Sequence, residues 1–394
     1  MRLCTITYRP RRGWSAPFPT DADSDATLVV VFGAESFATA PAPILEVLAA
    51  FPRSHVIGCS TSGEIAGDCI HDGTLTVAIA RFATATLVSA STAVNGSADS
   101  CAAGERIAEA MLGEAATAAA LRAVFVVSDG LHVNGSELVR GLNGVLPPEI
   151  VVTGGLAGDG DRFRRTWVLN ADRDAEGRPR GPRENLVAAI GLCGTGLRVG
   201  HGSRGGWDRF GPERVVTRSA GNVLYELDGK PALDLYRTYL GERAAGLPAT
   251  ALLFPLALRT DAADDKRLVR TILSIDETER SMTFAGDIPQ GSRAQLMRAN
   301  FERLIEGAGR AAEHARGIGA HGTQGDTLAI AISCVGRRLI LGERAEEEVA
   351  AALEALPPAA RQIGFYSYGE ISPYATGACD LLNQTMTMTT LSEA

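Results

Sequence analysis

Two similar octapeptides contain carboxylate and hydroxyl side chains whose spacing could form a site. GCSTSGEI, residues 58–65, returns as GFYSYGEI, residues 364–371, with both glycines, the glutamate and the isoleucine in common. A carboxylate can pair with an amine or a guanidinium, or it can order a loop by accepting backbone N–H bonds. Gly–acid pairs are also ordinary turns. The octapeptides alone therefore leave open whether Glu64 and Glu370 bind a ligand or shape a turn.

A third Gly–acid pair stands at Gly158–Asp159, again after a short apolar run. A glycine at the end of a strand lets a ligand approach main-chain N–H groups closely. We therefore predict that the three turns lie at the mouth of one ligand site. Its candidate residues are Gly58, Ser60, Thr61, Gly63, Glu64, Gly158, Asp159, Tyr366, Tyr368, Gly369 and Glu370.

Tyrosines gather in the second octapeptide, where Tyr366, Tyr368 and Tyr374 fall close together. A tyrosine has an apolar face and a polar tip, which suits a ligand pocket or an interface. Alternate tyrosines can also simply share one face of a strand. Both interpretations remain open from the sequence.

Known catalytic motifs are missing from the sequence. GCSTSGE is not G-x-S-x-G, because Ser62 occupies the fifth position, and neither a P-loop nor H-E-x-x-H occurs. A hydrolase built around Cys59, Ser60 or Ser62 is an alternative without a recognisable base. We expect a protein that is not an enzyme.

Each Gly–acid pair closes a predicted strand–helix–strand unit. The units begin with strands at 27–33, 123–128 and 327–333 and continue into helices at 43–51, 136–146 and 346–355. A helix between two strands favours a parallel pair with a right-handed crossover. The pattern predicts an α/β fold, with α+β as the alternative, built of repeated strand–helix–strand units in strand-rich layers and two associated halves. Residues 334–338 are expected in a loop and residues 290–315 in one long helix.

Composition shifts divide the chain into four parts. A glycine-rich stretch at 201–213 separates the two halves. The predicted parts are an N-terminal segment at 1–26, a first domain at 27–212, a second domain at 213–380 and a tail at 381–394.

Charge and apolar runs limit the class of protein. The 394 residues are 45% apolar and carry a net charge of −8, which argues against a nucleic-acid surface. The apolar runs are strand-sized, so we expect no membrane span, and the first residues lack the apolar core of a signal peptide. Seven scattered cysteines are typical of reduced thiols, and we expect a cytoplasmic protein.

Several motifs, in this order, resemble the FIST sensory family. They are VIGCSTSGEI, the SDG of 128–130 with GGLAGDG, LLFPLAL, MTFAGDIPQGSRAQLM, SCVGRR and GFYSYGEI. By this resemblance, residues 27–212 are FIST N-like and residues 213–380 are FIST C-like. The resemblance implies a bacterial signal-transduction sensor that binds a small ligand, with amino acids favoured. The partner that it implies is a sensor histidine kinase or another signalling output protein, and the oligomeric state stays open.

A narrower resemblance links residues 200–219 and 381–394 to stand-alone FIST proteins that bind haem and sense nitric oxide. It implies haem as the cofactor, and His201, near Trp207 and Phe210, as the axial ligand. His132 is the fallback ligand, followed by Cys59 or Cys379 as thiolates. A sensor of amino acids or of another small ligand without haem is the alternative, and a scaffold that binds only a partner protein is a further one.

Overall fold

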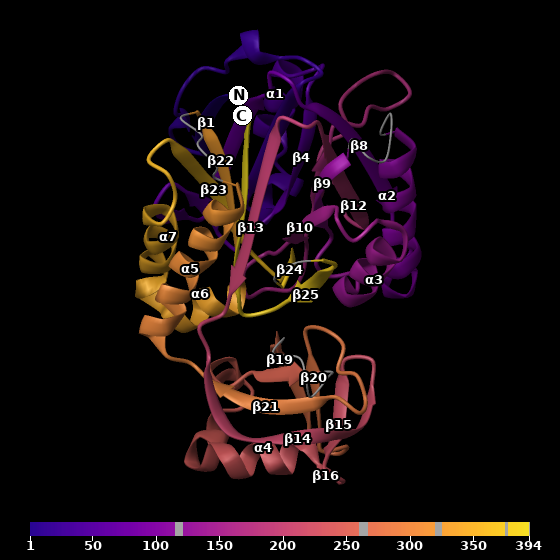
Figure 1. Cartoon of the computed structure of the whole chain (residues 1–394), viewed down its shortest axis with the longest axis vertical. Helices are drawn as coiled ribbons and strands as arrows, with labels where there is room; N and C mark the ends of the chain where they lie inside the picture. Colours follow the sequence, from indigo (N-terminus) through magenta and orange to yellow (C-terminus); the bar gives the residue numbers. More distant parts are fainter. Residues whose placement is uncertain (115–120, 260–266, 320–324, 375–376, 394) are drawn as a thin grey trace.

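The computed structural model describes residues 1–114, 121–259, 267–319, 325–374 and 377–393. Figure 1 shows a large body with a smaller lobe below it. The lobe, residues 208–298, is inserted between strand β13 (Leu197–Arg204) and helix α5 (Phe301–Gly319), both of which belong to the body. Two short stretches, 205–207 and 299–300, therefore connect the lobe to the body, and we call them the hinge segments.

Three strand–helix–strand units form the body. Unit 1 contains β3 (Thr27–Gly33), α1 (Ala42–Ala50) and β4 (His55–Ser60). Unit 2 contains β9 (Leu121–Ser128), α3 (Gly135–Val145) and β10 (Val151–Leu156). Unit 3 contains β22 (Thr327–Cys334), α6 (Val335–Leu341), α7 (Ala345–Glu354) and β23 (Ala360–Ser367). The two strands of each unit are parallel neighbours. The predicted α/β fold of repeated units is confirmed.

Each unit has its own six-stranded sheet, and each sheet includes one or two strands from the segment that follows another unit. The strand orders are β11-β4-β3-β7-β1-β2, β25-β24-β10-β9-β12-β8 and β13-β26-β22-β23-β5-β6. After unit 1, β5 (Glu64–Ala66) and β6 (Cys69–His71) join the sheet of unit 3. After unit 3, β24 (Gly369–Pro373) and β25 (Cys379–Leu382) join unit 2, and after unit 2, β11 (Val168–Asn170) joins unit 1. The three units are therefore interlocked in a closed cycle.

One returning strand completes each unit. These strands, β7 (Leu75–Arg81), β12 (Leu186–Cys193) and β26 (Met386–Glu393), run antiparallel to the first strand of their own unit. Beyond them lie β1 (Arg2–Arg9) with β2 (Gly13–Trp14), β8 (Thr86–Ala93) and β13. The predicted tail, 381–394, thus belongs to β25 and β26, while residue 394 lies outside the described residues.

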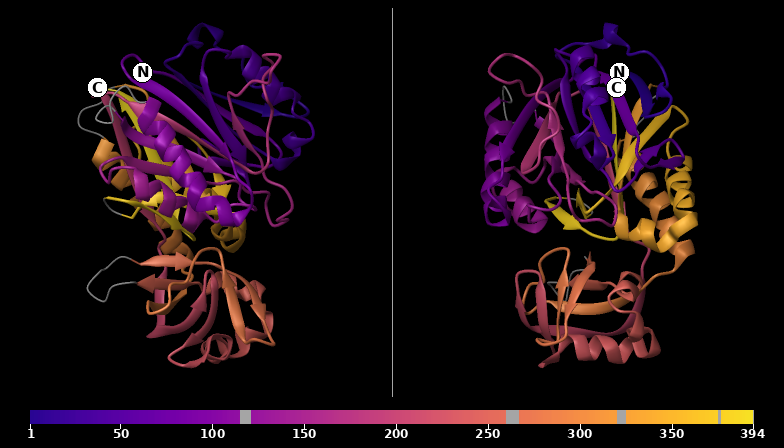
Figure 2. Two further views of the ribbon diagram at one scale, coloured as in Figure 1. Left: turned by 90° about the vertical axis from the view of Figure 1, so that its right-hand side faces the viewer. Right: turned by 180° about the vertical axis from the view of Figure 1, so that it is seen from behind.

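The inner faces of the three sheets share one apolar core. Phe32, Phe125 and Phe365 come from the three sheets, and the rings of Phe32 and Phe365 are 4.6 Å apart between centroids. Helices cover the outer faces: α1 on unit 1, α2 (Ser100–Glu114) and α3 on unit 2, and α5 and α7 on unit 3 (Figure 2). The core lies between the sheets, so a displacement of one unit disturbs the other two.

A glycine occupies the same place in the second strand of every unit. An added Cβ there would lie 1.8–2.0 Å from a carbonyl oxygen of the first strand, which is closer than any real contact. The pairs are Gly58 beside Val31, Gly154 beside Val126, and Gly364 beside Ala331. The first glycine of each octapeptide is therefore required by the packing of two strands.

The lobe is a twisted antiparallel sheet with one helix. Its strand order is β18-β17-β21-β14-β15-β20-β19, with β16 (Lys230–Pro231) beside β15. The bounds are β14 (Asp208–Ala220), β15 (Val223–Leu227), β17 (Leu256–Arg259), β18 (Leu268–Arg270), β19 (Ile272–Asp276), β20 (Ser281–Phe284), β21 (Arg293–Arg298) and α4 (Ala232–Leu240). Helix α4 covers one face of this sheet and closes the lobe core with it (Figure 1). The predicted boundary between residues 212 and 213 lies inside β14.

Two secondary-structure predictions are wrong. The long helix predicted at 290–315 is β21 followed by α5, because Ala294 and Leu296 alternate into the lobe core as strand residues. Residues 334–338, predicted as a loop, belong largely to α6. Val335 and Leu341 are buried, so tertiary packing holds this short helix where the local sequence gives little signal.

Gly58→Ala and Gly364→Ala are expected to destabilise the protein by about 1–3 kcal/mol each, because the new methyl group meets a backbone carbonyl. Gly144→Ala is the matched control, since this glycine in α3 has open space around its Cβ position. Urea unfolding of the three variants measures the difference. Equal stability of all three variants would show that the strand packing does not require these glycines.

Candidate functional site

A cleft of about 850 Å³ lies between the body and the lobe. This volume falls within the range of about 300–1,000 Å³ that is usual for sites of small organic molecules. The body contributes the start of α3, the loop after β10 and the start of α6, while the lobe contributes the loop before β17 and the ends of β19 and β20. A molecule in this cleft would contact both parts at once.

The cleft is mostly apolar, and some of its apolar side chains reach solvent. Phe163 is 51% exposed, Leu339 is 49% exposed and Leu273 is 47% exposed. They come from the loop after β10, from α6 and from β19 in the lobe. Exposed apolar side chains that converge on one hollow are typical of a binding site rather than of a plain surface.

Tyr368 and Phe163 form an aromatic wall of the cleft. Their rings are stacked, with centroids 4.5 Å apart and an interplanar angle of 13°. The Tyr368 hydroxyl donates to the carboxylate of Asp159 and also to the carbonyl of Gly160. Of the predicted site residues, Tyr368 is the one that lines the cleft, and Asp159 holds it there.

Asp159 also orders the loop that carries Phe163. Its carboxylate accepts the backbone N–H groups of Phe163, Arg164 and Arg165 at 2.8–3.0 Å. Burial opposes ionisation of Asp159, but the hydrogen bonds from Tyr368 and the three N–H groups outweigh it and lower its pKa. Phe163 has a positive φ of 50°, which a bulky residue rarely adopts. The ionised carboxylate thus holds a strained loop that presents an aromatic ring to the cleft.

Glu64 and Glu370 lie in the interior instead. Oε2 of Glu370 accepts the backbone N–H and hydroxyl of Thr385, just before β26, and its Oε1 accepts from Ser367. Glu64 repeats this pattern with Thr74, just before β7, and with Thr61. Each carboxyl group therefore fixes the start of a returning strand. In unit 2 that contact comes from Asp129, which accepts the N–H of Asn185 at 2.7 Å.

The three Gly–acid turns meet at the centre of the body. Ser62 donates its N–H to the carbonyl of Tyr366, Tyr368 donates to that of Leu156, and Gly158 donates to that of Ser60. The octapeptides therefore lie next to each other, as copies of one unit should. Their acids nevertheless point into the protein, and the turns lock the units together.

The other predicted residues also have structural contacts. The Ser60 and Ser62 hydroxyls accept backbone N–H groups, and Thr61 both donates to Glu64 and accepts from Gly63. Gly63 lies under Arg338, Gly158 against Ser62, and Gly369 against Leu381. Tyr366 is fully buried and donates to Glu348. Neither serine is presented to the cleft.

His201 does not fit a haem ligand in this structure. It is 5% exposed in β13, and its ring centroid is 6.3 Å from that of His314. Burial, with a contribution from His314, lowers its pKa to about 4. At the adjacent Gly202, an added Cβ would lie 2.0 Å from the Ala311 carbonyl of α5, so helix and strand leave no slot for a porphyrin. The described lining of the cleft contains no histidine.

The remaining haem candidates do not line the cleft. Cys59 and Cys379 are buried thiols, and burial raises the pKa of Cys59 well above its usual value. His132 contacts Asp129 next to the cleft. Across the described residues, no cluster of three or more His, Cys, Asp or Glu side chains is arranged to hold a metal ion. We therefore derive no step through haem.

Comparison with known proteins identifies the family. The sequence model of the FIST N domain matches residues 27–230, and that of the FIST C domain matches residues 232–373. The chain belongs to the FIST family. FIST domains indicate a sensory signal-transduction protein, so the predicted family and the sensory class are confirmed.

Other comparisons add little to this assignment. A search of curated proteins found no match. Nineteen chains of solved structures match, among them a crystal structure of chorismatase. That enzyme is 10% identical, with 99% of this chain and 98% of the chorismatase chain covered, and the TM-score is 0.37. No helix in the described parts of this FIST protein is long and apolar enough to cross a membrane.

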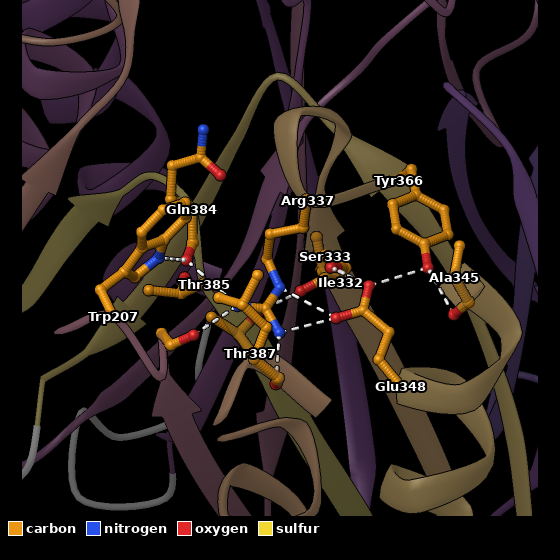
Figure 3. A network of polar contacts seen from close by, with 12 residues as sticks. Trp207, Ile332, Ser333, Arg337, Ala345, Glu348, Tyr366, Gln384, Thr385 and Thr387 are labelled. Carbon is orange, nitrogen blue, oxygen red and sulfur yellow. Dashed lines mark hydrogen bonds and ion pairs between the residues drawn. The ribbon is translucent and has the colours of Figure 1, made fainter. Parts of the chain in front are cut away.

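A buried arginine joins the first hinge segment of this FIST protein to the start of α5 (Figure 3). Arg337, in α6, binds Oε2 of Glu348 through Nε and Nη2 at 2.9 and 2.7 Å, and both side chains are fully buried. Its Nη1 donates to the carbonyl of Gly205 at 2.5 Å, and its Nη2 donates to the carbonyl of Leu304 at 2.7 Å. Gly205 belongs to the first hinge segment, and Leu304 lies in the first turn of α5, just after the second.

The same helix reaches the cleft. Val335, Gly336 and Leu339 of α6 line it, while Arg337 points into the body. Trp207, at the end of the first hinge segment, donates its indole N–H to the carbonyl of Gln384 at 2.8 Å (Figure 3). A shift of α6 caused by a molecule in the cleft would therefore reach the hinge through one side chain.

Sequence reasoning missed most of the cleft. Several segments that line it were not among the predicted ligand residues. They are Leu131, Asn134, residues 246–249, residues 271–273 and residues 284–287. A usable signal was present in MTFAGDIPQ and SCVGRR, which support the family resemblance and supply parts of opposite walls.

The buried acids predict an unusual pH dependence. Burial raises the pKa of Glu64 from its usual 4.5 to about 7 and that of Glu370 to about 8. A carboxyl group with a raised pKa keeps its proton in the folded state while the unfolded chain loses it. Stability should therefore fall as the pH rises from about 4.5 to about 8, by about 3 kcal/mol for Glu64 and about 5 kcal/mol for Glu370.

Glu64→Gln/Glu370→Gln mimics the protonated groups and should flatten this fall, as measured by urea unfolding between pH 5.5 and pH 8.5. Asp159→Asn is the control. The pKa of Asp159 is lowered, so its contribution is constant over this range and is lost only as the pH falls below its ordinary value of 3.8. Parallel curves for the wild type and the double variant would contradict the assignment.

Arg337→Met should lower the free energy of unfolding by about 3–5 kcal/mol, because it leaves the Glu348 carboxylate buried without its partner. Arg337→Met/Glu348→Leu should recover part of that loss while leaving the carbonyls of Gly205 and Leu304 without their donor. Trypsin should therefore cut the double variant faster than the wild type after Arg204 and Arg298, which flank the hinge segments. Arg344→Met, which removes an exposed ion pair, should change neither result. A double variant that trypsin cuts no faster than the wild type would contradict the view that the bonds from Arg337 to Gly205 and Leu304 hold the hinge segments in place.

Proposed function

We propose that this FIST protein senses a small molecule that binds in the cleft, and that the bound molecule changes the position of the lobe relative to the body. The observation that carries the proposal is the cleft itself, whose lining comes from both parts and includes exposed apolar side chains. The ligand that we propose is bound without haem.

The physical argument rests on differential binding. A ligand shifts an equilibrium between two arrangements only to the extent that it binds one of them better. A molecule held by Phe163 and Leu339 on one side and by Leu273 on the other keeps all its contacts in one relative position of lobe and body. The two hinge segments allow such movement. The bonds from Arg337 to the carbonyls of Gly205 and Leu304 define the position from which the lobe starts to move.

The output that we propose is read by a second protein. Sensory proteins act through a signalling partner, and a sensor histidine kinase is the first candidate that the family resemblance suggests. The surface of the lobe that changes position would be the part that this partner reads. Haem and nitric oxide have no place in the proposal, since the surroundings of His201 do not accommodate a porphyrin.

A neutral apolar probe tests the cleft. We expect 4-phenylbutanol to bind the full chain and to reduce its radius of gyration in small-angle X-ray scattering, because it draws lobe and body together. Leu339→Arg places a charge in the apolar wall and should abolish both effects. Leu45→Arg changes an exposed leucine of α1, outside the cleft, and should leave both intact. Equal binding by the two variants would refute the cleft as the site.

A further inference from the structure

The ionisable side chains of the cleft have one sign. Its described lining contains the carboxylates of Asp161 and Asp287 and no arginine, lysine or histidine. The thiol of Cys334 is neutral, because burial raises its pKa to about 12. A carboxylate or phosphate ligand would therefore meet like charge here, whereas a cation would meet opposite charge in a partly desolvated site.

Asp287 stands where lobe and body meet. Its backbone is anchored twice: its N–H donates to the Ser136 hydroxyl at 3.2 Å, and its carbonyl accepts from Nε of Arg270 at 3.1 Å. Its carboxylate accepts a long hydrogen bond of 3.4 Å from Nδ2 of Asn134. The backbone is thus fixed while the carboxylate retains capacity for a stronger donor.

Arg270 offsets this charge only from behind the cleft wall. It is 5% exposed, and its guanidinium donates to the carbonyls of Asp287 and Leu381. Burial lowers its pKa to about 10, although the carboxylates of Asp380 and Asp287 act in the opposite direction. Arg270 therefore stays charged at neutral pH. Arg270 does not belong to the described lining, whereas Asp161 and Asp287 both do.

A second polar group lies close to Asp287. Thr271 lines the cleft, is 7% exposed, and has a hydroxyl that makes no hydrogen bond with any described residue. It follows Arg270 directly, and its carbonyl accepts the N–H of Ala285. A buried hydroxyl without a partner is costly, so a hydrogen-bonding group of a ligand that reached it would remove that cost.

The aromatic wall suits the rest of such a molecule. Phe163 lies against Tyr368 and is half exposed, so a flat apolar group can cover it. The faces of aromatic rings are negative and attract cations, which adds to the effect of the carboxylates. The polar corner and the aromatic wall belong to one cleft.

We propose that the ligand of this cleft is an organic cation: an amine, guanidinium or quaternary ammonium group on an apolar or aromatic body. The cationic group lies at Asp287 and Thr271, and the apolar body lies against Phe163 and Leu339. This inference rests on the proposed function and narrows its ligand to one chemical class.

Three probes with the same body separate charge from shape. These are 4-phenylbutylamine, 4-phenylbutanol and 4-phenylbutyrate, which are cationic, neutral and anionic at pH 7. Calorimetric titration of the full chain should give at least tenfold tighter binding for the amine than for the carboxylate, with the alcohol between them. Equal affinities, or tighter binding of the carboxylate, would overturn the inference while leaving the proposed cleft in place. Failure of all three to bind would overturn both.

Asp287→Asn should weaken binding of the amine at least fivefold and leave binding of the alcohol unchanged. Asp161→Asn should have a smaller effect in the same direction. Asp234→Asn is the control, because it removes an equal charge from α4 of the same lobe, outside the cleft. If Asp234→Asn weakened amine binding as much as Asp287→Asn, the preference would reflect overall charge and the inference would fail. Circular dichroism confirms that each variant is folded.

Discussion

The Arg337 guanidinium joins the wall of the cleft to the chain that leads into the lobe. It is fully buried, neutralised by Glu348, and bonded to a carbonyl in the first hinge segment and to another just after the second. A buried ion pair often adds little net stability, because desolvation of both charges offsets their attraction. What it gives here is position, since its planar donors bind two carbonyls on either side of the lobe, Gly205 and Leu304, in one fixed geometry. Tyr366 and Ser333 complete the set by donating to the other oxygen of Glu348.

The acids of the three Gly–acid turns have two different structural roles. In units 1 and 3, the acids are Glu64 and Glu370, which lie in the interior and hold the start of a returning strand. In unit 2, Asp129 holds that strand, and Asp159 orders the loop of Phe163 instead. The cleft therefore lies beside the unit whose turn acid orders a loop instead of a returning strand.

Much of the fold could be predicted from the sequence. Buried apolar runs, helical spacing and recurring Gly–acid turns identify three strand–helix–strand units, and the structure confirms them. The closed exchange of strands could not be predicted, because the pairing of β5 with β23 depends on tertiary contacts between segments far apart in the chain. The same limit explains why β21 was predicted to be helical. The apolar positions of residues 293–298 fit both the period of a strand and that of a helix.

The site was harder to predict for a related reason. A repeated motif attracts attention, but here the repeat marks the interlocking of the units. Of the 11 predicted ligand residues, Tyr368 lines the cleft, Asp159 supports its wall, and the other nine serve the interior or its turns. Tyr368 was found because aromatic residues gather near it. Asp287 and Thr271 are ordinary residues of an antiparallel lobe, and only the fold places them opposite Phe163 and α6.

Hydrogen exchange of the full chain, with and without saturating 4-phenylbutylamine, tests the central claim most directly. The account predicts slower exchange on both sides of the cleft, at residues 131–137 and 335–339 of the body and at 246–252 and 271–287 of the lobe. It also predicts a change at the hinge residues 205–207. Protection confined to the body, or centred on β13 around His201, would contradict a ligand that binds between the two parts and moves one against the other.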